Sequence, residues 1–246
     1  MNIALLLSGG TGTRMGSDIP KQYMEVDGRP IISYCIERLS LHARIDAFWI
    51  VADADWHGMV SDCLEKYDAR KKFRGFSMPG ENRQLSILNG LEDIRKCAEV
   101  SDYVLIHDAA RPLVTDKLIS DCFEALDGHD GALPVLPMKD TVYCSEDGRR
   151  IFSLINRSRI YAGQAPELFR LGLYYEANRR LLPERILEIN GSTEPAVMAE
   201  LDVAMFAGDE NNFKITTKAD LERFKKIVRE NGIGQKGAPD ESNGTA

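Results

Sequence analysis

The sequence has no hydrophobic run near the roughly 20 residues that a membrane-spanning helix needs, and it has no surplus of basic residues. Its 31 Lys and Arg stand against 38 Asp and Glu, for a net charge of −7, which argues against a general nucleic-acid binder. The five cysteines are far apart and form no Cys-x-x-Cys pair, so we expect neither a disulfide framework nor a zinc site. An apolar run that begins at Ile3 leaves no room for a signal peptide. We therefore expect a cytoplasmic protein with no membrane or nucleic-acid partner.

The first apolar run, Ile3 to Leu7, leads into a loop that is rich in glycine and carries positive charge. Short continuous apolar runs are typical of buried strands in parallel sheets. Glycines just after such a strand let the backbone turn sharply and bring its N–H groups close to a ligand. Three glycines are combined with two cations, namely Gly9, Gly10, Gly12, Arg14 and Lys21. The combination suits a polyphosphate, and the alternative is a glycine turn that merely ends a strand.

Two better-known phosphate-binding motifs are missing from this loop. No Gly-Lys-Ser/Thr follows the glycines, as the mononucleotide P-loop requires. Met15 stands where the dinucleotide-binding fingerprint needs a small residue, so a dehydrogenase is not expected.

Apolar runs alternate with helical patterns along most of the chain. Further strands are expected at 47–52, 73–78, 103–106 and 131–136, with helices at 31–41, 56–67, from 85 onward and at 117–126. This alternation predicts an α/β, Rossmann-like fold, with a mostly parallel sheet and helices on both faces. The length suits one domain over residues 1–231. Residues 232–246 have too little apolar area to order themselves, which predicts a disordered tail.

The alternation breaks between about residues 138 and 163. Thr141 to Cys144 and Ile151 to Ile155 flank an Asp-Gly turn, which predicts a β-hairpin. An isolated hairpin is marginally stable in water, so we expect an arm that protrudes from the sheet and packs on a partner. A twofold homodimer is the simplest partner, and the alternative is an arm that folds back on its own domain.

The last third of the chain predicts three helices and one strand. Helices are expected at 171–182 and at 195–201, the latter capped by Ser192 or Thr193 with Pro195 in its first turn. A short strand is expected at 212–216, and Thr217 can cap a final helix that runs to about Arg229.

Polar residues follow several of the predicted strands, at the carboxyl ends where parallel sheets bind ligands. Asp108 could help to hold a metal–nucleotide complex or a ribose, and Arg111 could bind phosphate. A structural Asp–Arg pair is an equally good interpretation of these two residues. Arg157 beside the arm and Lys214 on the last strand are also candidates, although solvated surface is the default interpretation of both.

Several motifs occur together in one order: Ser8-Gly9-Gly10-x-Gly12-x-Arg14-Met15-Gly16, Pro20-Lys21-Gln22-Tyr23, Gly80-x-x-Arg83-x-x-Ser86, His107 to Pro112, Asp140-Thr141, Gln164-x-Pro166 and Phe213-Lys214-Ile215-Thr216. In this series, from residue 3 to about 228, the chain resembles the cytidylyltransferases that act on 2-C-methyl-D-erythritol 4-phosphate and on ribitol 5-phosphate. A lone glycine loop would indicate only a nucleotidyltransferase, whereas the ordered set is specific to this family.

The resemblance implies that CTP and a polyol phosphate react to give a CDP-polyol and pyrophosphate. Mg2+ would be bound mainly through the CTP phosphates, and no residue is assigned as its ligand. Catalysis would rest on positioning and charge stabilisation. The implied catalytic residues are Arg14 and Lys21, on the α-phosphorus and the departing pyrophosphate, and Lys214 and Arg157, on the acceptor phosphate. Arg157 would reach across the homodimer.

The family motifs also imply which residues bind the substrates. Two loops would bind cytidine and triphosphate, through Leu7, Ser8, Gly9, Gly10, Gly12, Gly80, Arg83 and Ser86. Asp108 would lie near the ribose or the metal, and Thr141 and Arg111 would face the acceptor.

Departures from the family pattern bear on the choice of acceptor. Thr193-Glu194-Pro195-Ala196-Val197 stands where methylerythritol-type members usually carry Thr-Asp-Glu-Ala-Ser. Tyr161-Ala162-Gly163-Gln164 is closer to the ribitol type, although Ala165 replaces the usual threonine. We therefore expect ribitol 5-phosphate or a similar pentitol phosphate, as in cell-surface polymer synthesis. The alternative is 2-C-methyl-D-erythritol 4-phosphate of isoprenoid precursor synthesis.

Two other functions remain as alternatives. One is an enzyme that joins a sugar 1-phosphate to a different nucleotide. The other is a protein that binds nucleotide without turning it over, and the presence of Arg14, Lys21 and Lys214 argues against it.

Overall fold

The structure, a computed structural model, describes residues 1–10 and 19–232. The predicted site residues Gly12 and Arg14 lie outside the described residues. So does the predicted tail, apart from Gly232, whose left-handed backbone (φ +59°) ends the last helix.

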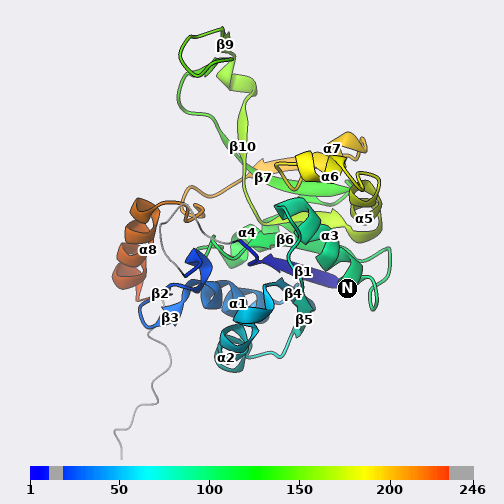
Figure 1. The fold of residues 1–246 in the computed structure, drawn as a ribbon, viewed down its shortest axis with the longest axis vertical. Helices are drawn as coiled ribbons and strands as arrows, with labels where there is room; N and C mark the ends of the chain where they lie inside the picture. Colours follow the sequence, from blue (N-terminus) through cyan, green and yellow to red (C-terminus); the bar gives the residue numbers. More distant parts are fainter. Residues whose placement is uncertain (11–18, 233–246) are drawn as a thin grey trace, which may run out of the picture.

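An eight-stranded sheet forms the centre of the molecule (Figure 1). The strand order is β10-β7-β11-β6-β1-β4-β5, and β12 also pairs with β7. Neighbouring strands are parallel except at β10 and β11, which are antiparallel to the strands beside them. The predicted α/β fold with a mostly parallel sheet is thus confirmed. The strand bounds are β1 (Asn2–Leu7), β4 (Ala47–Val51), β5 (Phe73–Ser77), β6 (Tyr103–Asp108), β7 (Gly131–Pro137), β10 (Tyr161–Gly163), β11 (Glu167–Arg170) and β12 (Val203–Ala207).

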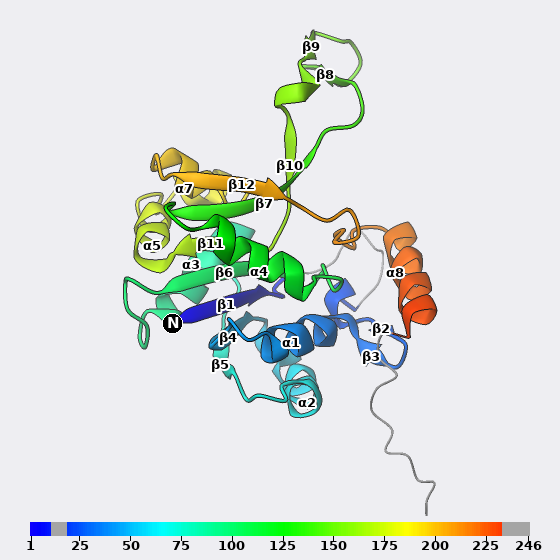
Figure 2. The same cartoon turned by 180° about the vertical axis from the view of Figure 1, so that it is seen from behind.

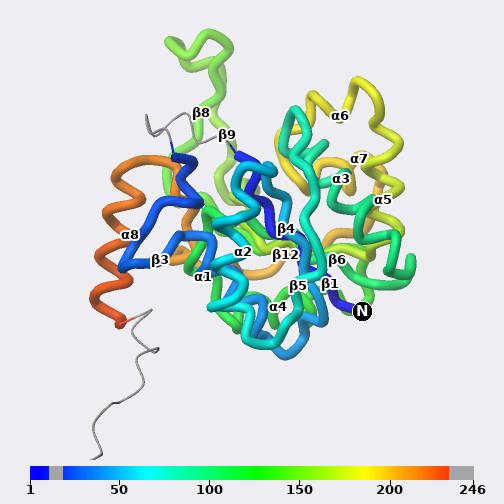
Figure 3. Tube along the Cα trace, turned by 60° about the horizontal axis from the view of Figure 1, so that its bottom comes forward, coloured from blue at the N-terminus to red at the C-terminus, as the bar shows by residue number. Residues whose placement is uncertain are grey.

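Helices cover both faces of the sheet (Figures 1 and 2). One face carries α1 (Ile31–Leu41), α2 (His57–Tyr67) and α4 (Asp116–Ala125). The other carries α3 (Arg83–Ile94), α5 (Leu171–Arg179) and α7 (Glu194–Met198), with α6 (Arg185–Glu188) packed on α3. The last helix, α8 (Lys218–Asn231), lies beside α1 and the small hairpin of β2 (Glu25–Val26) and β3 (Arg29–Pro30) (Figure 3).

The side chains of β1 show why the strands read as continuous apolar runs. Ala4 and Leu6 pack with α1, α2 and α4, whereas Ile3 and Leu5 pack with α3, α5 and α7. All four are fully buried. A strand that is covered on both faces needs apolar residues at every position. From Ile3 onward, polar residues begin only after Leu7, where β1 ends at the carboxyl edge of the sheet.

The end of the chain differs from the sequence prediction. The strand predicted at 212–216 does not form, and β12 lies upstream of it, at Val203–Ala207. Residues 212–216 run past the end of β6, where the Ile215 N–H donates to the Ala110 carbonyl at 2.8 Å. The short strands β10 and β11 were not predicted either, because the segment that holds them is broken by Gln164 and Pro166 and has no alternating apolar pattern.

The predicted cap of α7 is confirmed in position but not in its hydrogen bond. Pro195 lies in the first turn and Thr193 stands at the N-cap position, but no side-chain hydrogen bond caps the helix. The hydroxyls of Ser192 and Thr193 donate instead to the buried carboxylate of Glu167. The prediction for α8 is confirmed, because Thr217 and Asp220 form a reciprocal capping box at its start.

The predicted hairpin arm is present. Its strands, β8 (Val142–Cys144) and β9 (Ser153–Ile155), pair antiparallel, and a short 3-10 turn, η4 (Arg157–Arg159), follows. In Figures 1 and 2 the arm extends away from the sheet, so it does not fold back on its own domain.

Two expectations from the composition can be compared with the structure. All five cysteines are free thiols. In the part of the chain that the structure describes, no helix is long and apolar enough to cross a membrane.

Truncation of Leu6 to alanine removes buried apolar volume from the centre of the sheet. We expect Leu6→Ala to lower the free energy of unfolding by about 2–5 kcal/mol, measured by urea denaturation. The control is Leu41→Ala at the end of α1, where the side chain is 44% exposed and the expected loss is below about 1 kcal/mol. Equal losses in the two variants would contradict the packing described for β1.

Candidate active site

The glycine turn after β1 is held by side chains of the next segment. The amide of Gln22, in the 3-10 turn η2 (Lys21–Tyr23), donates to the carbonyls of Ser8 and Gly10, both at 2.7 Å. The Tyr23 hydroxyl also donates to the Ser8 carbonyl, at 2.9 Å. Because Gln22 and Tyr23 fix the backbone of this turn, Lys21 is placed beside it, and Lys21 and the turn line one cavity.

A second loop packs against the glycine turn. A Cβ on Gly9 would lie 2.6 Å from the Cβ of Pro79, and a Cβ on Gly80 would lie 2.6 Å from Leu85. Only glycine permits so close an approach at either position. Asn82 then caps α3, because its side-chain oxygen accepts from the Leu85 N–H at 2.8 Å. The cap sets Arg83 in the first turn of the helix, next to the cavity.

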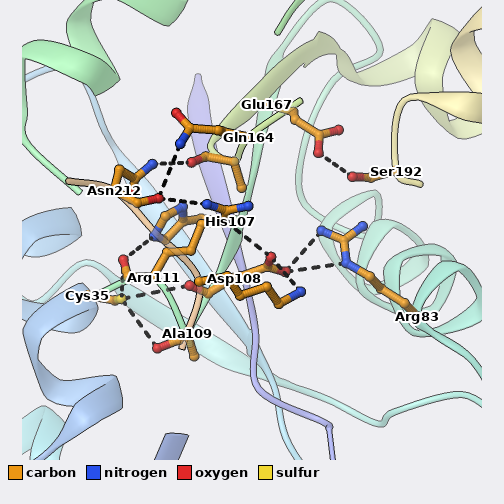
Figure 4. A network of polar contacts seen from close by, with 12 residues as sticks. Cys35, Arg83, His107, Asp108, Ala109, Arg111, Gln164, Glu167, Ser192 and Asn212 are labelled. Atoms are coloured by element: carbon orange, nitrogen blue, oxygen red, sulfur yellow. Dashed lines mark hydrogen bonds and ion pairs between the residues drawn. The ribbon is translucent and has the colours of Figure 1, made fainter. Parts of the chain in front are cut away.

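Among the described residues, three cations meet at the carboxylate of Asp108, at the end of β6. Two of them, Arg83 and Arg111, are labelled in Figure 4. Arg83 donates to one carboxylate oxygen through Nη2 at 3.0 Å and Nε at 3.3 Å. Lys214 Nζ lies 3.0 Å from the other oxygen, and Arg111 Nε lies 3.7 Å from it. In the register of the sheet Asp108 is opposite Leu7 of β1, which places it beside the glycine turn.

Hydrogen bonds to backbone carbonyls bring the distant Lys214 to Asp108. The Arg111 guanidinium donates to the Asn212 carbonyl at 2.6 Å, and the side-chain amide of Asn212 donates to the Ala165 carbonyl at 2.6 Å. With the bond from Ile215 to Ala110, these contacts hold residues 212–215 across the end of β6.

Burial and charge act in opposite directions on Asp108. Burial by itself raises the pKa of the carboxyl, but the charges of Arg83, Lys214 and Arg111 outweigh it and hold that pKa well below its usual range. Asp108 is therefore ionised at neutral pH.

The neighbouring His107 is neutral. Burial lowers its pKa to about 4, and its Nε2 lies 3.1 Å from the Arg111 carbonyl. Since a carbonyl only accepts hydrogen bonds, Nε2 carries the proton. His107 thus supports the backbone after β6 and adds no charge.

These elements enclose a cavity of about 420 Å³ at the carboxyl ends of β1 and β6. It brings together most of the predicted site residues: Leu7, Ser8, Gly9, Gly10, Lys21, Gly80, Arg83, Ser86, Asp108 and Lys214. Its walls also include residues that were not predicted, namely Gln22, Val51, Glu81, Asn82, Ala110 and Thr216. Gln22, Ala110 and Thr216 stand inside the quoted motifs, and Glu81 and Asn82 occupy the unspecified positions of Gly80-x-x-Arg83. Val51 carries no signal beyond its place near the end of a predicted strand.

Three of the predicted residues that the structure describes do not line the cavity. Arg111 is packed behind Asp108, where it is one of the cations that hold the carboxylate. Thr141 and Arg157 belong to the exposed arm, and the Arg157 guanidinium donates to the Lys139 carbonyl at 2.6 Å.

A second buried carboxylate, Glu167, was not predicted. It lies on β11, opposite Ile106 of β6, and accepts hydrogen bonds from the hydroxyls of Ser192 and Thr193. Burial raises the pKa of Glu167, although the charge of Arg83 and the two hydroxyls act against burial. The sequence gives no sign of this role, because Glu167 follows a proline in an irregular segment.

Known proteins resemble this chain over nearly its whole length. The model of the family IspD: 2-C-methyl-D-erythritol 4-phosphate cytidylyltransferase matches residues 2–230. A bifunctional enzyme IspD/IspF of Granulibacter bethesdensis is 37% identical over 228 residues, which are 92% of this chain and 56% of that protein. A ribitol-5-phosphate cytidylyltransferase of Streptococcus pneumoniae serotype 2 is 33% identical over 232 residues, which are 93% of this chain and 99% of that protein. The chain thus spans about half the length of the bifunctional relative.

Solved structures show the same fold. The 4-diphosphocytidyl-2C-methyl-D-erythritol synthase of Anaerococcus prevotii has a TM-score of 0.78 at 24% identity and covers 93% of this chain and 96% of its own. The 2-C-methyl-D-erythritol 4-phosphate cytidylyltransferase of Francisella tularensis has a TM-score of 0.77 at 24% identity, with 92% and 98% covered. The predicted Rossmann-like architecture is confirmed.

Removal of the Asp108 charge leaves three cations without their shared partner. We expect Asp108→Asn to lower the free energy of unfolding at pH 7 by about 3–5 kcal/mol. The pKa of Asp108 in the folded state lies below its unfolded value of about 3.9. The ionised carboxylate therefore stabilises the fold above about pH 3.9, and this stabilisation is lost as the pH falls toward the folded-state pKa.

Urea denaturation between about pH 7 and pH 3 measures this effect. The wild-type protein should lose more stability on acidification than Asp108→Asn does. Asp62→Asn, which changes an exposed carboxylate of α2, should follow the wild type. An Asp108→Asn profile as steep as that of the wild type would contradict the charge balance described above.

Proposed function

Because the chain belongs to the 2-C-methyl-D-erythritol 4-phosphate cytidylyltransferase (IspD) family, we propose that it transfers CMP from CTP to a polyol phosphate and releases pyrophosphate. One observation carries the proposal: Lys21, Arg83 and Lys214 line the same cavity as the Gly9–Gly10 backbone. Glycine backbone on one wall and several cations on the others suit a triphosphate and a second phosphate.

In the proposed reaction an oxygen of the acceptor phosphate attacks the α-phosphorus of CTP. The bond from the α-phosphorus to the bridging oxygen breaks, and pyrophosphate leaves with that electron pair, so no covalent enzyme intermediate is needed. Lys21, with Arg14 from outside the described residues, would stabilise the charge on the α-phosphate and the pyrophosphate. Lys214 would hold the acceptor phosphate. Asp108 fixes Arg83 and Lys214 before substrate arrives, so little rearrangement is needed.

We propose Mg2+ as the metal, bound mainly through the CTP phosphates. Among the residues described, no group of three or more His, Cys, Asp or Glu side chains could hold a metal ion. Asp108 and Glu81 do line the cavity, and one or two carboxylates together with substrate phosphates are a common Mg2+ environment. The cavity therefore fits such a metal, and no residue is assigned as its ligand. When bound, the metal would withdraw charge from the phosphates.

Ribitol 5-phosphate or a similar pentitol phosphate is the proposed acceptor, and 2-C-methyl-D-erythritol 4-phosphate is the alternative. The segments 161–164 and 193–197 support the first, and similarity to proteins of both names supports each. We place the reaction in the cytoplasm, where the five free thiols would stay reduced.

We also propose a homodimer that forms through the arm. Four large apolar side chains of the arm, Tyr143, Ile151, Phe152 and Leu154, are 53–69% exposed in the single chain. Exposed apolar groups of this kind are typical of interaction surfaces. Arg157 and Thr141 lie on the same arm, so a twofold pair would let them serve the partner's cavity.

Release of pyrophosphate from CTP, measured with ribitol 5-phosphate, 2-C-methyl-D-erythritol 4-phosphate and other polyol phosphates, tests the activity and the acceptor. If Lys21 stabilises the transition state by about 3–4 kcal/mol, Lys21→Ala should lower kcat roughly 100- to 1000-fold. Lys66→Ala, at an exposed position of α2, should leave kcat unchanged. Higher activity with UTP than with CTP would refute the proposal.

A mixture of two inactive variants tests whether the arm completes the partner's site. Arg157→Ala and Lys21→Ala subunits are unfolded together in urea and refolded, so that mixed dimers form. A mixed dimer keeps one site with both residues, so random pairing should restore about a quarter of the wild-type activity. If each chain uses its own Arg157, no activity returns.

A further inference from the structure

Glu167 is a buried carboxylate that the proposed reaction does not use. Its side chain is enclosed between β11 and the turn before α7, and the residue is 7% exposed. One carboxylate oxygen accepts from the Ser192 hydroxyl and the other from the Thr193 hydroxyl, the latter at 2.9 Å. Burial of a carboxylate is unfavourable unless its oxygens are satisfied. Two hydroxyl donors meet that need here, and they also tie the 192–193 turn to the sheet.

Hydrogen bonds connect this 192–193 turn to the first turn of α3. The Tyr174 hydroxyl donates to the Ser192 carbonyl at 2.7 Å, and the Gln84 amide lies 3.3 Å from that hydroxyl. The Asn82 amide donates to the Ile186 carbonyl at 2.8 Å. Asn82 and Gln84 are the two neighbours of Arg83. The Ile186 carbonyl holds the Asn82 side chain, and Tyr174, which donates to the Ser192 carbonyl, holds the Gln84 side chain.

Electrostatic attraction also connects Glu167 to Arg83. The Glu167 carboxylate, like that of Asp108, attracts the Arg83 guanidinium, and together they raise the pKa of Arg83 although burial acts to lower it. Arg83 donates to Asp108 (Figure 4). Arg83 also lines the cavity, whereas Glu167 does not line it. Any effect of Glu167 on a ligand must therefore pass through its neighbours.

We propose that Glu167 is a positioning residue for nucleotide binding: it fixes the 192–193 turn, and through that turn it sets Arg83 against Asp108. The inference rests on the proposed CTP site. A purely structural role is the competing explanation, and it would show in stability and not in the affinity for CTP.

Steady-state kinetics of pyrophosphate release, with CTP varied at saturating acceptor, separate the two explanations. Glu167→Ala should raise KM for CTP about tenfold and change kcat less than about threefold, because binding and not the chemical step is affected. Glu167→Gln should stay within about threefold of the wild type in both, since its amide can accept from one hydroxyl and donate to the other.

Asp68→Ala is the matched control. Asp68 is also a buried carboxylate, which accepts from the Ser40 hydroxyl at 2.6 Å and from the Phe73 N–H at 3.0 Å, but it does not line the cavity. The Asp68→Ala substitution should lower Tm and leave KM for CTP unchanged. If Glu167→Ala does not fold, Ser192→Ala combined with Thr193→Val removes the same two hydrogen bonds and should raise KM about tenfold as well.

Non-additivity tests the path through Arg83. Arg83→Leu should raise KM for CTP, and adding Glu167→Ala should raise it no further, because residues that act as one unit are not additive. Multiplicative effects in the double variant, or an unchanged KM in Glu167→Ala, would overturn the proposal.

The wild-type enzyme tests the proposed function separately. Absence of pyrophosphate release from CTP with every acceptor would refute that function, whatever Glu167 does. Equilibrium binding of CTP would then test the role of Glu167. The Kd should rise about tenfold in Glu167→Ala and stay unchanged in Asp68→Ala.

Discussion

The pairing of one buried carboxylate with three cations is the constraint on which the candidate site depends. Arg83, Arg111 and Lys214 come from three separate parts of the chain and meet only at Asp108. Without that carboxylate they would repel one another in a poorly solvated place, and without them its ionised form would be strongly disfavoured. Each cation is therefore directed toward the same carboxylate. A surplus of positive charge can then face the cavity in a protein whose net charge is −7.

Close packing of two loops gives this charge cluster its shape. Gly9 and Gly80 are not needed for a left-handed backbone, since neither has a positive φ. They are needed because a side chain on either would overlap Pro79 or Leu85. The glycine turn and the start of α3 can thus form adjoining walls, with Arg83 on the second wall and Lys21 beside the first.

Much of the fold and more than half of the described cavity lining could be predicted from the sequence, for identifiable reasons. Strands such as β1 and β4 are buried on both faces and are uniformly apolar, and α1 has the bounds that its helical spacing predicts. The strand predicted at 212–216 is absent because that segment bonds to the end of β6. Glu167 could not be found, because its partners Ser192 and Thr193 lie 25 and 26 residues away and resemble helix caps. The local sequence shows which polar groups need a hydrogen-bond partner, but the fold determines which partner each group has.

Lys214 follows Asp108 by 106 residues, and this separation has a consequence for synthesis on the ribosome. The glycine turn, Arg83 and Asp108 leave the exit tunnel early, while the 212–216 segment is still being made. Until it emerges, Asp108 has two of its three cations and the cavity lacks the wall formed by Lys214 and Thr216. A nascent chain that has not yet released residues 212–216 therefore carries an unfinished pocket.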